Sequence, residues 1–163
     1  MQFIIIKKNT LLFDEFKFKC SLGKNGKTLN KIEGDNRTPK GSYGLGPLYY
    51  REDRIHKPST KIQKIKIKKN FGWCDDATSK FYNKPINIKN KVRHEKLFRN
   101  DKKYDLLIPI KYNSKKPKKN KGSAIFLHLT SNYTKTQGCI AVKKKDMLIL
   151  LKLINKNTKI KIY

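Results

Sequence analysis

The chain has 163 residues, with 40 Lys and Arg against 12 Asp and Glu, and a formal charge of +28. This length suffices to bury a core without metal or disulfide cross-links, so we expect one domain over residues 1–163. With 37% hydrophobic and 10% aromatic residues, the composition excludes a disordered basic tail. Three scattered cysteines exclude a dense disulfide framework and a paired-cysteine zinc site.

The charge first suggests a protein that binds nucleic acid or another polyanion without catalysis. Only five of the 40 basic residues are Arg, which is the residue suited to bidentate phosphate and base contacts. Lys, Asn and Ile, which A/T-rich codons encode, are abundant together. We therefore interpret most of the charge as a solvated surface, expect no nucleic-acid partner, and keep a polyanion binder as the alternative function.

Alternation of apolar with charged residues, or short apolar runs between turn residues, predicts a mainly β fold. In chain order we expect strands at residues 3–6, 16–20, 45–50, 61–68, 104–112, 123–129 and 158–163. Pro109 suggests a bulge or an edge position for the fifth of these, and the first reads as a buried strand. Residues 72–76 and 113–122 are expected as polar loops, and residues 146–153 as a buried helix. No run approaches the roughly 20 apolar residues of a membrane span, and no secretory signal is visible at residues 1–9.

The stretch from residue 123 to 142 holds the residues suited to covalent chemistry. His128 ends an apolar run, and Cys139 follows Gly138. A thiol attacks as a thiolate, so it needs a neighbouring base, and a glycine allows the turn that exposes the sulfur and aligns backbone N–H groups. The same pattern also fits a structural cysteine and a core histidine, so the residues alone leave open whether Cys139 and His128 are catalytic or structural.

The segment Thr136-Gln137-Gly138-Cys139-Ile140, with His128 upstream, resembles the active-site motif of the L,D-transpeptidase (YkuD-type) family. Residues 34–43 resemble that family's Thr-Pro-x-Gly-aromatic block. Further segments resemble a single-domain bacterial branch of the family: residues 49–51, 72–76, 82–83, 104–105 and 122–128. The resemblance implies a β-sandwich-like fold with short helices.

The resemblance also implies a reaction. Cys139 would attack the carbonyl at position three of a peptidoglycan tetrapeptide stem, and His128 would act as general base and acid. Backbone N–H groups at Gly138 and Cys139 would hold the oxyanion. An amine acceptor would give a 3–3 cross-link, and water would give L,D-carboxypeptidase activity; the choice stays open. The implied enzyme is carbapenem-sensitive and monomeric, uses no metal or cofactor, and works in the cell envelope, where it can also meet anionic wall polymer.

Substrate-binding candidates lie in the turns and strand ends around the motif: Asp35, Arg37, Trp73, Asp75, Tyr112, Asn113, Thr136 and Gln137. For Asp35 and Arg37, a surface turn held by an Asx-type hydrogen bond is an equally good interpretation. Trp73 fits a packed loop better than a substrate wall. Tyr112 also fits the end of a strand.

Overall fold

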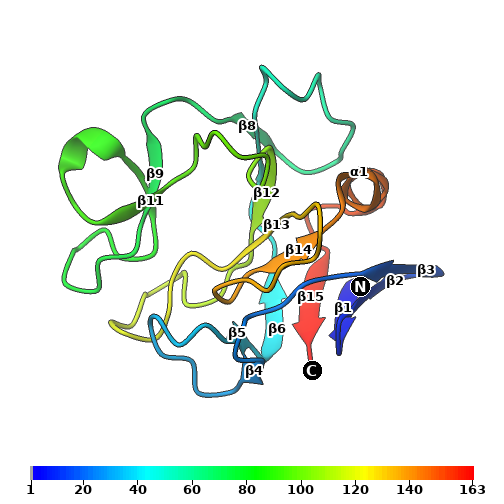
Figure 1. The fold of residues 1–163 in the computed structure, drawn as a ribbon, viewed down its shortest axis with the longest axis horizontal. Helices are drawn as coiled ribbons and strands as arrows, with labels where there is room; N and C mark the ends of the chain where they lie inside the picture. The colour runs from blue at the N-terminus through cyan, green and yellow to red at the C-terminus, as the bar shows by residue number, and fades with distance from the viewer. Residues whose placement is uncertain (1) are drawn as a thin grey trace.

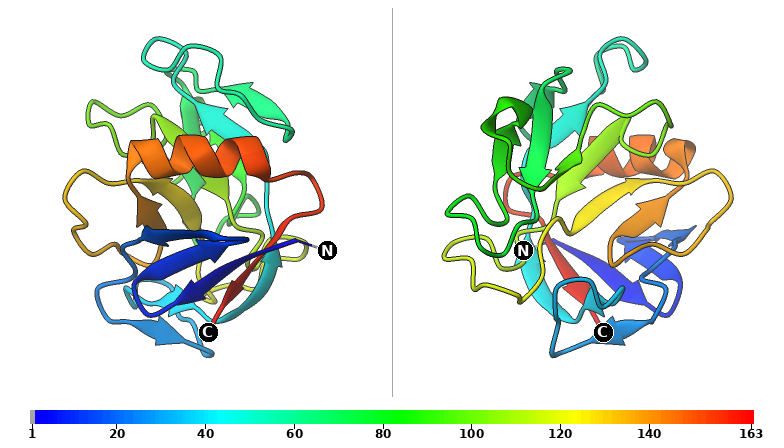
Figure 2. Two further views of the ribbon diagram at one scale, coloured as in Figure 1. Left: turned by 90° about the vertical axis from the view of Figure 1, so that its right-hand side faces the viewer. Right: turned by 60° about the vertical axis from the view of Figure 1, so that its left-hand side comes forward.

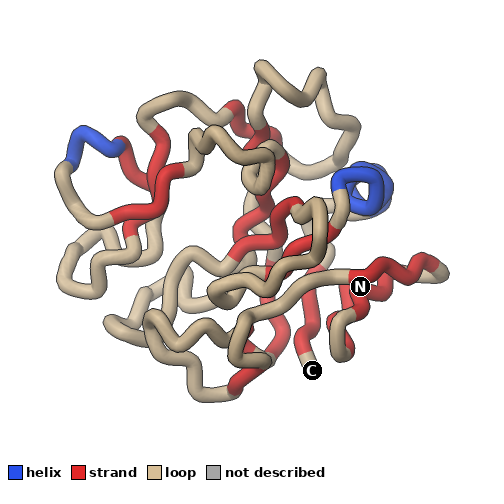
Figure 3. The backbone as a smooth tube through the Cα atoms, viewed as in Figure 1, coloured by secondary structure: helices blue, strands red, loops and turns tan. Residues whose placement is uncertain are grey.

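The computed structural model of the protein describes residues 2–163, and most of its regular structure is β-strand (Figures 1 and 3). The elements are β1 (Phe3–Lys7), β2 (Thr10–Phe13), β3 (Phe16–Lys19), β4 (Lys27–Thr28), β5 (Thr38–Pro39), β6 (Gly41–Gly44), β7 (Leu48–Tyr50), β8 (Lys64–Lys66), β9 (Phe71–Cys74), β10 (Pro85–Asn87), η1 (Ile88–Asn90), β11 (His94–Lys96), β12 (Leu106–Pro109), β13 (Phe126–Leu129), β14 (Ile140–Val142), α1 (Lys144–Leu153) and β15 (Lys159–Ile162). The predicted mainly β fold is confirmed. Among the described residues, no helix is long and apolar enough to cross a membrane.

Three of the four sheets among the described residues form the layers of the fold, and the fourth is the two-stranded pair β4-β5. Two are five-stranded, with the orders β3-β2-β1-β15-β6 and β14-β13-β12-β7-β8, and one is three-stranded, with the order β10-β9-β11. In Figure 1 the β12–β14 region lies between α1 and β15 on one side and β9 and β11 on the other. The central sheet, β14-β13-β12-β7-β8, therefore has a packed layer on each face.

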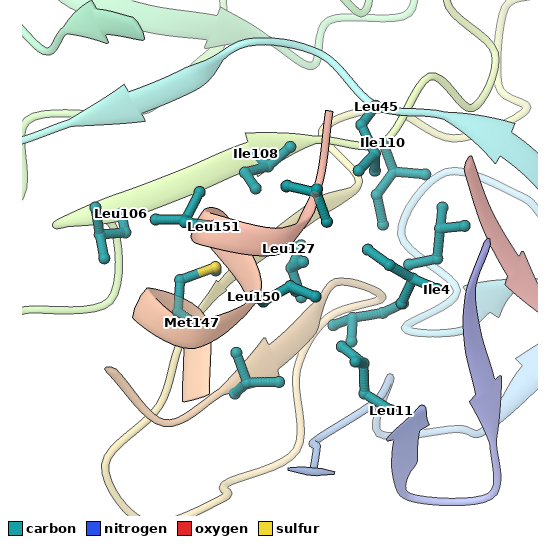
Figure 4. Packing of buried hydrophobic residues seen from close by; sticks show 14 of the residues in the cluster. Ile4, Leu11, Leu45, Leu106, Ile108, Ile110, Leu127, Met147, Leu150 and Leu151 are labelled. Atoms are coloured by element: carbon teal, nitrogen blue, oxygen red, sulfur yellow. The ribbon is translucent and has the colours of Figure 1, made fainter. Parts of the chain in front are cut away.

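One face of the central sheet packs against α1 and the β1–β15 sheet. Strands β1 and β15 run parallel with Ile4 opposite Ile160, and both of these side chains are fully buried. Helix α1 adds Met147, Leu150 and Leu151 to the same core (Figure 4). The predicted helix and C-terminal strand are thus confirmed. Figure 2 shows α1 lying across the molecule above the N-terminal strands.

The opposite face of the central sheet carries an aromatic cluster. Phe126 on β13 is fully buried and meets Trp73 of β9 edge-on at 5.1 Å and Tyr104 edge-on at 5.8 Å between ring centroids. Aromatic rings prefer this edge-to-face geometry because their edges are positive and their faces negative. The cluster fixes the distance between β13 and the three-stranded sheet, and it forms the floor on which the candidate site is built.

Three local predictions differ from the structure in whole or in part. Residues 72–76 are not a polar loop, because β9 covers residues 71–74 and pairs with both β10 and β11. Strand β12 is not an edge strand, because it lies between β13 and β7. The alternative of a bulge agrees with the pairing: Leu107 is opposite Tyr49 whereas Ile110 is opposite Leu45, so the register shifts by one residue around Pro109. Strand β1 is not wholly buried, because only Ile4 and Ile6 are fully covered.

Candidate active site

Strands β13 and β14 bring the predicted nucleophile and base to one face of the central sheet. The two strands are parallel, with Leu127 opposite Ile140 and His128 opposite Ala141. Cys139 immediately precedes β14 and therefore lies beside Phe126, one pleat from His128. Since alternate residues of a strand share a face, Cys139 and His128 face the same side of the sheet, offset by two residues, or roughly 7 Å, along neighbouring strands that lie about 4.8 Å apart.

The Cys139 sulfur lies in a small backbone cradle formed by the start of β13. The Phe126 N–H donates to Sγ at 3.3 Å, and the thiol donates to the Ala124 carbonyl at 3.2 Å. The side chain is buried, and this burial raises the pKa of the thiol to about 12. Nearby Glu95 also raises this pKa, while Lys31 and the Phe126 hydrogen bond lower it. In the resting protein Cys139 is therefore a protonated thiol.

His128 is held with one ring nitrogen engaged and the other available. Its Nδ1 lies 3.0 Å from the Leu129 carbonyl, which only accepts, so Nδ1 carries the proton and Nε2 keeps a lone pair. Tyr104 packs edge-on against the imidazole, with 5.2 Å between ring centroids. Burial lowers the pKa of His128 from 6.5 to about 4. His128 is thus neutral, with an unprotonated Nε2, and none of the hydrogen bonds among the described residues joins it to Cys139.

The lowered pKa of His128 predicts a loss of stability on acidification. The unfolded chain binds a proton on this histidine below about pH 6.5, whereas the folded chain binds it only near pH 4. The unfolded state is therefore favoured increasingly as the pH falls through this window, by ~2 kcal/mol between pH 7 and pH 5. Urea unfolding at the two pH values measures this change. A His128→Asn variant, which has no titrating ring, should lose that part of the pH dependence, and an unchanged slope would contradict the prediction.

The turn before Cys139 is fixed by Thr136 and Gly138. Thr136 Oγ1 donates to the Cys139 carbonyl at 2.6 Å and accepts from the Gly138 N–H at 3.1 Å. Gly138 has φ +134°, and a Cβ there would lie 2.8 Å from the Arg37 carbonyl oxygen. The backbone around residue 37 thus packs directly on the turn, which only glycine accommodates.

Replacing Gly138 with Ala should destabilise the protein, because the new Cβ meets rigid backbone and the positive φ is strained. We expect a cost of about 2–4 kcal/mol in unfolding free energy and a drop in Tm of roughly 5–15 °C. Gly26→Ala is the matched control, because Gly26 also has positive φ but has no atom within 4 Å of the place that a Cβ would occupy. Equal losses in the two variants, measured by thermal unfolding, would show that the close approach of Arg37 is unimportant.

A cavity of about 1250 Å³ opens over the Cys139 and His128 side chains. Of the predicted site residues, those that line it are Asp75, His128, Thr136, Gln137 and Cys139. Asp75 is held by the Arg93 Nε at 3.1 Å, and Gln137 is exposed. Among residues 2–163, no group of His, Cys, Asp and Glu side chains is arranged to hold a metal ion.

The other predicted substrate residues lie outside the cavity lining. Asp35 Oδ1 accepts from the Arg37 N–H at 2.9 Å, which is the Asx-type turn, and the Arg37 side chain is exposed. Trp73 is buried in the aromatic cluster. Tyr112 and Asn113 line a separate, smaller pocket of about 290 Å³.

Nearly the whole chain matches one known protein family. Residues 2–162 fit the sequence pattern of the L,D-transpeptidase catalytic domain, YkuD. The chain belongs to the L,D-transpeptidase catalytic-domain family. No curated protein sequence matches it.

Two solved structures resemble this L,D-transpeptidase domain. The helical cell shape determining protein Pgp2 (K307A mutant) from Campylobacter jejuni superimposes with a TM-score of 0.53 at 16% identity, over 99% of this chain and 46% of that one. An L,D-transpeptidase from Mycobacterium smegmatis gives a TM-score of 0.42 at 12% identity, over 99% of this chain and 57% of that one. The chain spans about half the length of these proteins, and at such identity the first of them supports the fold alone.

Three residues of this L,D-transpeptidase domain lie close to Cys139, or to the backbone that contacts it, without having been predicted as site residues. Tyr104 and Glu95 line the cavity beside Cys139, and the Tyr104 hydroxyl donates to the Glu95 carboxylate. Asn83 is buried and accepts a hydrogen bond from the Ala124 N–H. Only Tyr104 and Asn83 had any sequence signal, as parts of short segments that resemble the family, and nothing singled out Glu95.

Proposed function

We propose that this protein is a cysteine L,D-transpeptidase that acts on the peptidoglycan tetrapeptide stem, with Cys139 as nucleophile and His128 as general base. The observation that supports this assignment best is the placement of the two side chains. They line one open cavity from adjacent parallel strands, with the thiol protonated and the imidazole Nε2 unprotonated. A neutral thiol beside a neutral base is the starting state for general-base activation.

In the proposed reaction, the Cys139 thiol rotates from the Ala124 carbonyl towards His128 Nε2. The proton passes from Sγ to Nε2 as Sγ forms a bond to the carbonyl carbon at position three of the stem. The tetrahedral intermediate then breaks its C–N bond, and the His128 imidazolium gives the proton to the departing D-alanine amine. An acceptor amine loses its proton to Nε2, attacks the thioester and releases the Cys139 thiol; water in its place gives the free carboxylate.

The oxyanion requires backbone N–H groups that are not already engaged. The Gly138 N–H donates to Thr136 Oγ1, whereas the Gln137 and Cys139 N–H groups have no acceptor within the described residues 2–163. We therefore assign the oxyanion donors to Cys139 and Gln137, and give Gly138 the task of shaping the turn. Thr136 supports the same turn through its hydroxyl rather than by touching substrate.

Two measurements test the proposed function. Purified tetrapeptide muropeptides should release D-alanine, and the ratio of dimer to tripeptide product decides between cross-linking and hydrolysis. A carbapenem should form a covalent adduct, seen by intact-protein mass spectrometry and mapped to Cys139. Absence of both turnover and adduct in the folded wild type would reject the assignment, as would an adduct that survives in Cys139→Ala.

The proposal places the protein in the cell envelope, where its lysine-rich surface would hold it near anionic wall polymer. Raising the salt concentration screens such exposed charges, so binding to isolated sacculi should weaken steeply. Acylation by a small soluble β-lactam should change little, because it depends on the buried Cys139 and His128. Co-sedimentation with sacculi and adduct formation, measured over the same salt series, make the comparison. A parallel fall in both would mean that the charge acts at the site itself.

A further inference from the structure

The amide side chain of Asn83 contacts Ala124, the residue whose carbonyl accepts the Cys139 thiol proton, yet no step of the proposed reaction uses this amide. Asn83 is 5% exposed. Its Oδ1 accepts from the Trp73 Nε1–H at 2.9 Å and from the Ala124 N–H at 3.0 Å. Its Nδ2 donates to the carbonyls of Tyr112 at 3.0 Å and Asn113 at 2.7 Å. An Asn amide has two donors and one oxygen acceptor with two lone pairs, so every hydrogen-bonding position of Asn83 is filled.

Ala124 is held by this amide in an unusual backbone conformation. Its φ is +52°, in the left-handed region that residues with a Cβ seldom adopt and that surrounding contacts must enforce. The Asn83 Oδ1 bond to the Ala124 N–H is such a contact. Since φ and ψ of Ala124 set the direction of its own carbonyl relative to its N–H, the same bond determines where the carbonyl points.

That carbonyl is the acceptor of the Cys139 thiol, at 3.2 Å. Two residues further on, the Phe126 N–H donates to the same sulfur. The segment from Ala124 to Phe126 thus makes two hydrogen bonds with Sγ, one as acceptor and one as donor. The single thiol proton points to the Ala124 carbonyl rather than to His128. A hydrogen bond from the protonated form disfavours ionisation.

We propose that Asn83 is a positioning residue for the nucleophile: it fixes Ala124 so that its carbonyl holds Cys139 as a protonated thiol turned away from His128 in the resting protein. The charged and titratable groups that act on the sulfur from the surrounding elements are Glu95, Lys31 and Tyr104, and His128 lines the same cavity. None of these contacts Asn83 through a hydrogen bond among the described residues. Its effect therefore reaches Cys139 through Ala124. The description of Cys139 as the nucleophile rests on the proposed function, whereas the effect of Asn83 on the ionisation of the Cys139 thiol does not.

The test measures alkylation of Cys139 by iodoacetamide against pH, with peptide mapping to separate Cys139 from Cys20 and Cys74. Asn83→Gly removes the amide and still suits the positive φ of 57° at this position. Without the anchored carbonyl, the thiol should ionise more easily. We expect its alkylation at pH 8 to be roughly tenfold faster than in wild type, with the pH midpoint lower by about one unit. Alkylation of Cys139 at the wild-type rate would overturn the proposal.

Local unfolding is the competing explanation for a faster rate, and Cys74 reports on it. Cys74 is fully buried; its N–H donates to the Lys84 carbonyl and its carbonyl accepts from the Asn83 N–H, so opening of this region exposes it too. The proposal requires Cys139 to accelerate while Cys74 does not; equal acceleration of both thiols would reject it. Asn83→Asp keeps the one oxygen that accepts from Trp73 and Ala124. It replaces the Nδ2 donors to Tyr112 and Asn113 with a second oxygen and adds a negative charge. Because the bond to Ala124 is kept, its Cys139 rate should be no faster than that of wild type.

Asn113→Gly is the matched control. Asn113 also has positive φ, 47°, and its side chain makes three hydrogen bonds, to Lys118 and Gly122, but none to Ala124. The substitution keeps the Asn113 backbone carbonyl, which accepts from Asn83 Nδ2. Its rate of Cys139 alkylation should equal that of wild type.

Trp73→Phe is the second variant, for use if Asn83→Gly does not fold. It removes one donor to the Asn83 Oδ1 and should raise the rate of Cys139 alkylation by a few fold. An unchanged rate in this variant would overturn the proposal. If the wild type does not process muropeptides but Asn83→Gly still accelerates alkylation of Cys139, the proposed function is rejected and the positioning role of Asn83 stands.

Discussion

Replacing Cys139 with Ser is expected to lower turnover of the tetrapeptide stem by about 10³–10⁶-fold, the range seen when a covalent nucleophile is removed. A hydroxyl keeps the hydrogen bonds to the Ala124 carbonyl and the Phe126 N–H, so the fold should survive. It is, however, a far weaker nucleophile than a thiolate, and the neighbouring base is neutral histidine with a pKa lowered to about 4. Release of D-alanine and carbapenem adduct formation both report the loss.

The other two thiols provide the controls for this prediction. Cys20 and Cys74 are free and buried like Cys139, but neither lines the cavity. Cys20→Ala and Cys74→Ala should keep wild-type kcat/KM, although each leaves a small void in the core that costs stability. Activity of Cys139→Ser within tenfold of wild type would mean that another group is the nucleophile.

Local patterns in the sequence were sufficient to predict those strands and helices whose own apolar residues define a buried face. Ile160 and Ile162 alternate with lysines, and this period of two predicts β15 because one face of a strand is buried and the other is wet. The apolar run from residue 147 to 151 likewise predicts α1. The Gly138-Cys139 pair with upstream His128 predicted the candidate site in the same local way, because a thiol nucleophile needs only a nearby base and a turn that exposes the sulfur.

Features created by pairing between distant segments could not be predicted. Residues 71–74 became β9 because β10 and β11 supply hydrogen bonds on both sides, which outweighs the turn-forming residues Gly72 and Asp75. The sulfur's cradle depends on the parallel register of β13 and β14, and no residue type encodes a register. Asn83 precedes Lys84 and Pro85 and reads as a turn residue, so its central place among four partners emerges only in three dimensions.

Replacing His128 with Asn should slow formation of the acyl-enzyme by about 10²–10⁴-fold at neutral pH, the usual contribution of a general base. Asparagine can still donate to the Leu129 carbonyl in place of Nδ1–H, so the side chain keeps its anchor and loses only the Nε2 lone pair. His94→Asn is the matched control, because His94 Nδ1 also bonds a nearby carbonyl, that of Val92, at 2.7 Å, but the ring lies outside the cavity lining. That variant should keep wild-type rates.

The pH profile of the His128→Asn variant carries the sharper expectation. In wild type, His128 Nε2 is unprotonated above about pH 4, so the acylation rate should be nearly level from pH 5 to pH 8. Without the base only thiolate reacts, and with the Cys139 pKa raised to about 12 by burial the thiolate is roughly one part in 10⁵ at pH 7. The variant's rate should therefore rise tenfold per pH unit and approach wild type only at high pH. A level profile in the variant would show that His128 does not take the thiol proton, because a base elsewhere in the cavity would then be doing so.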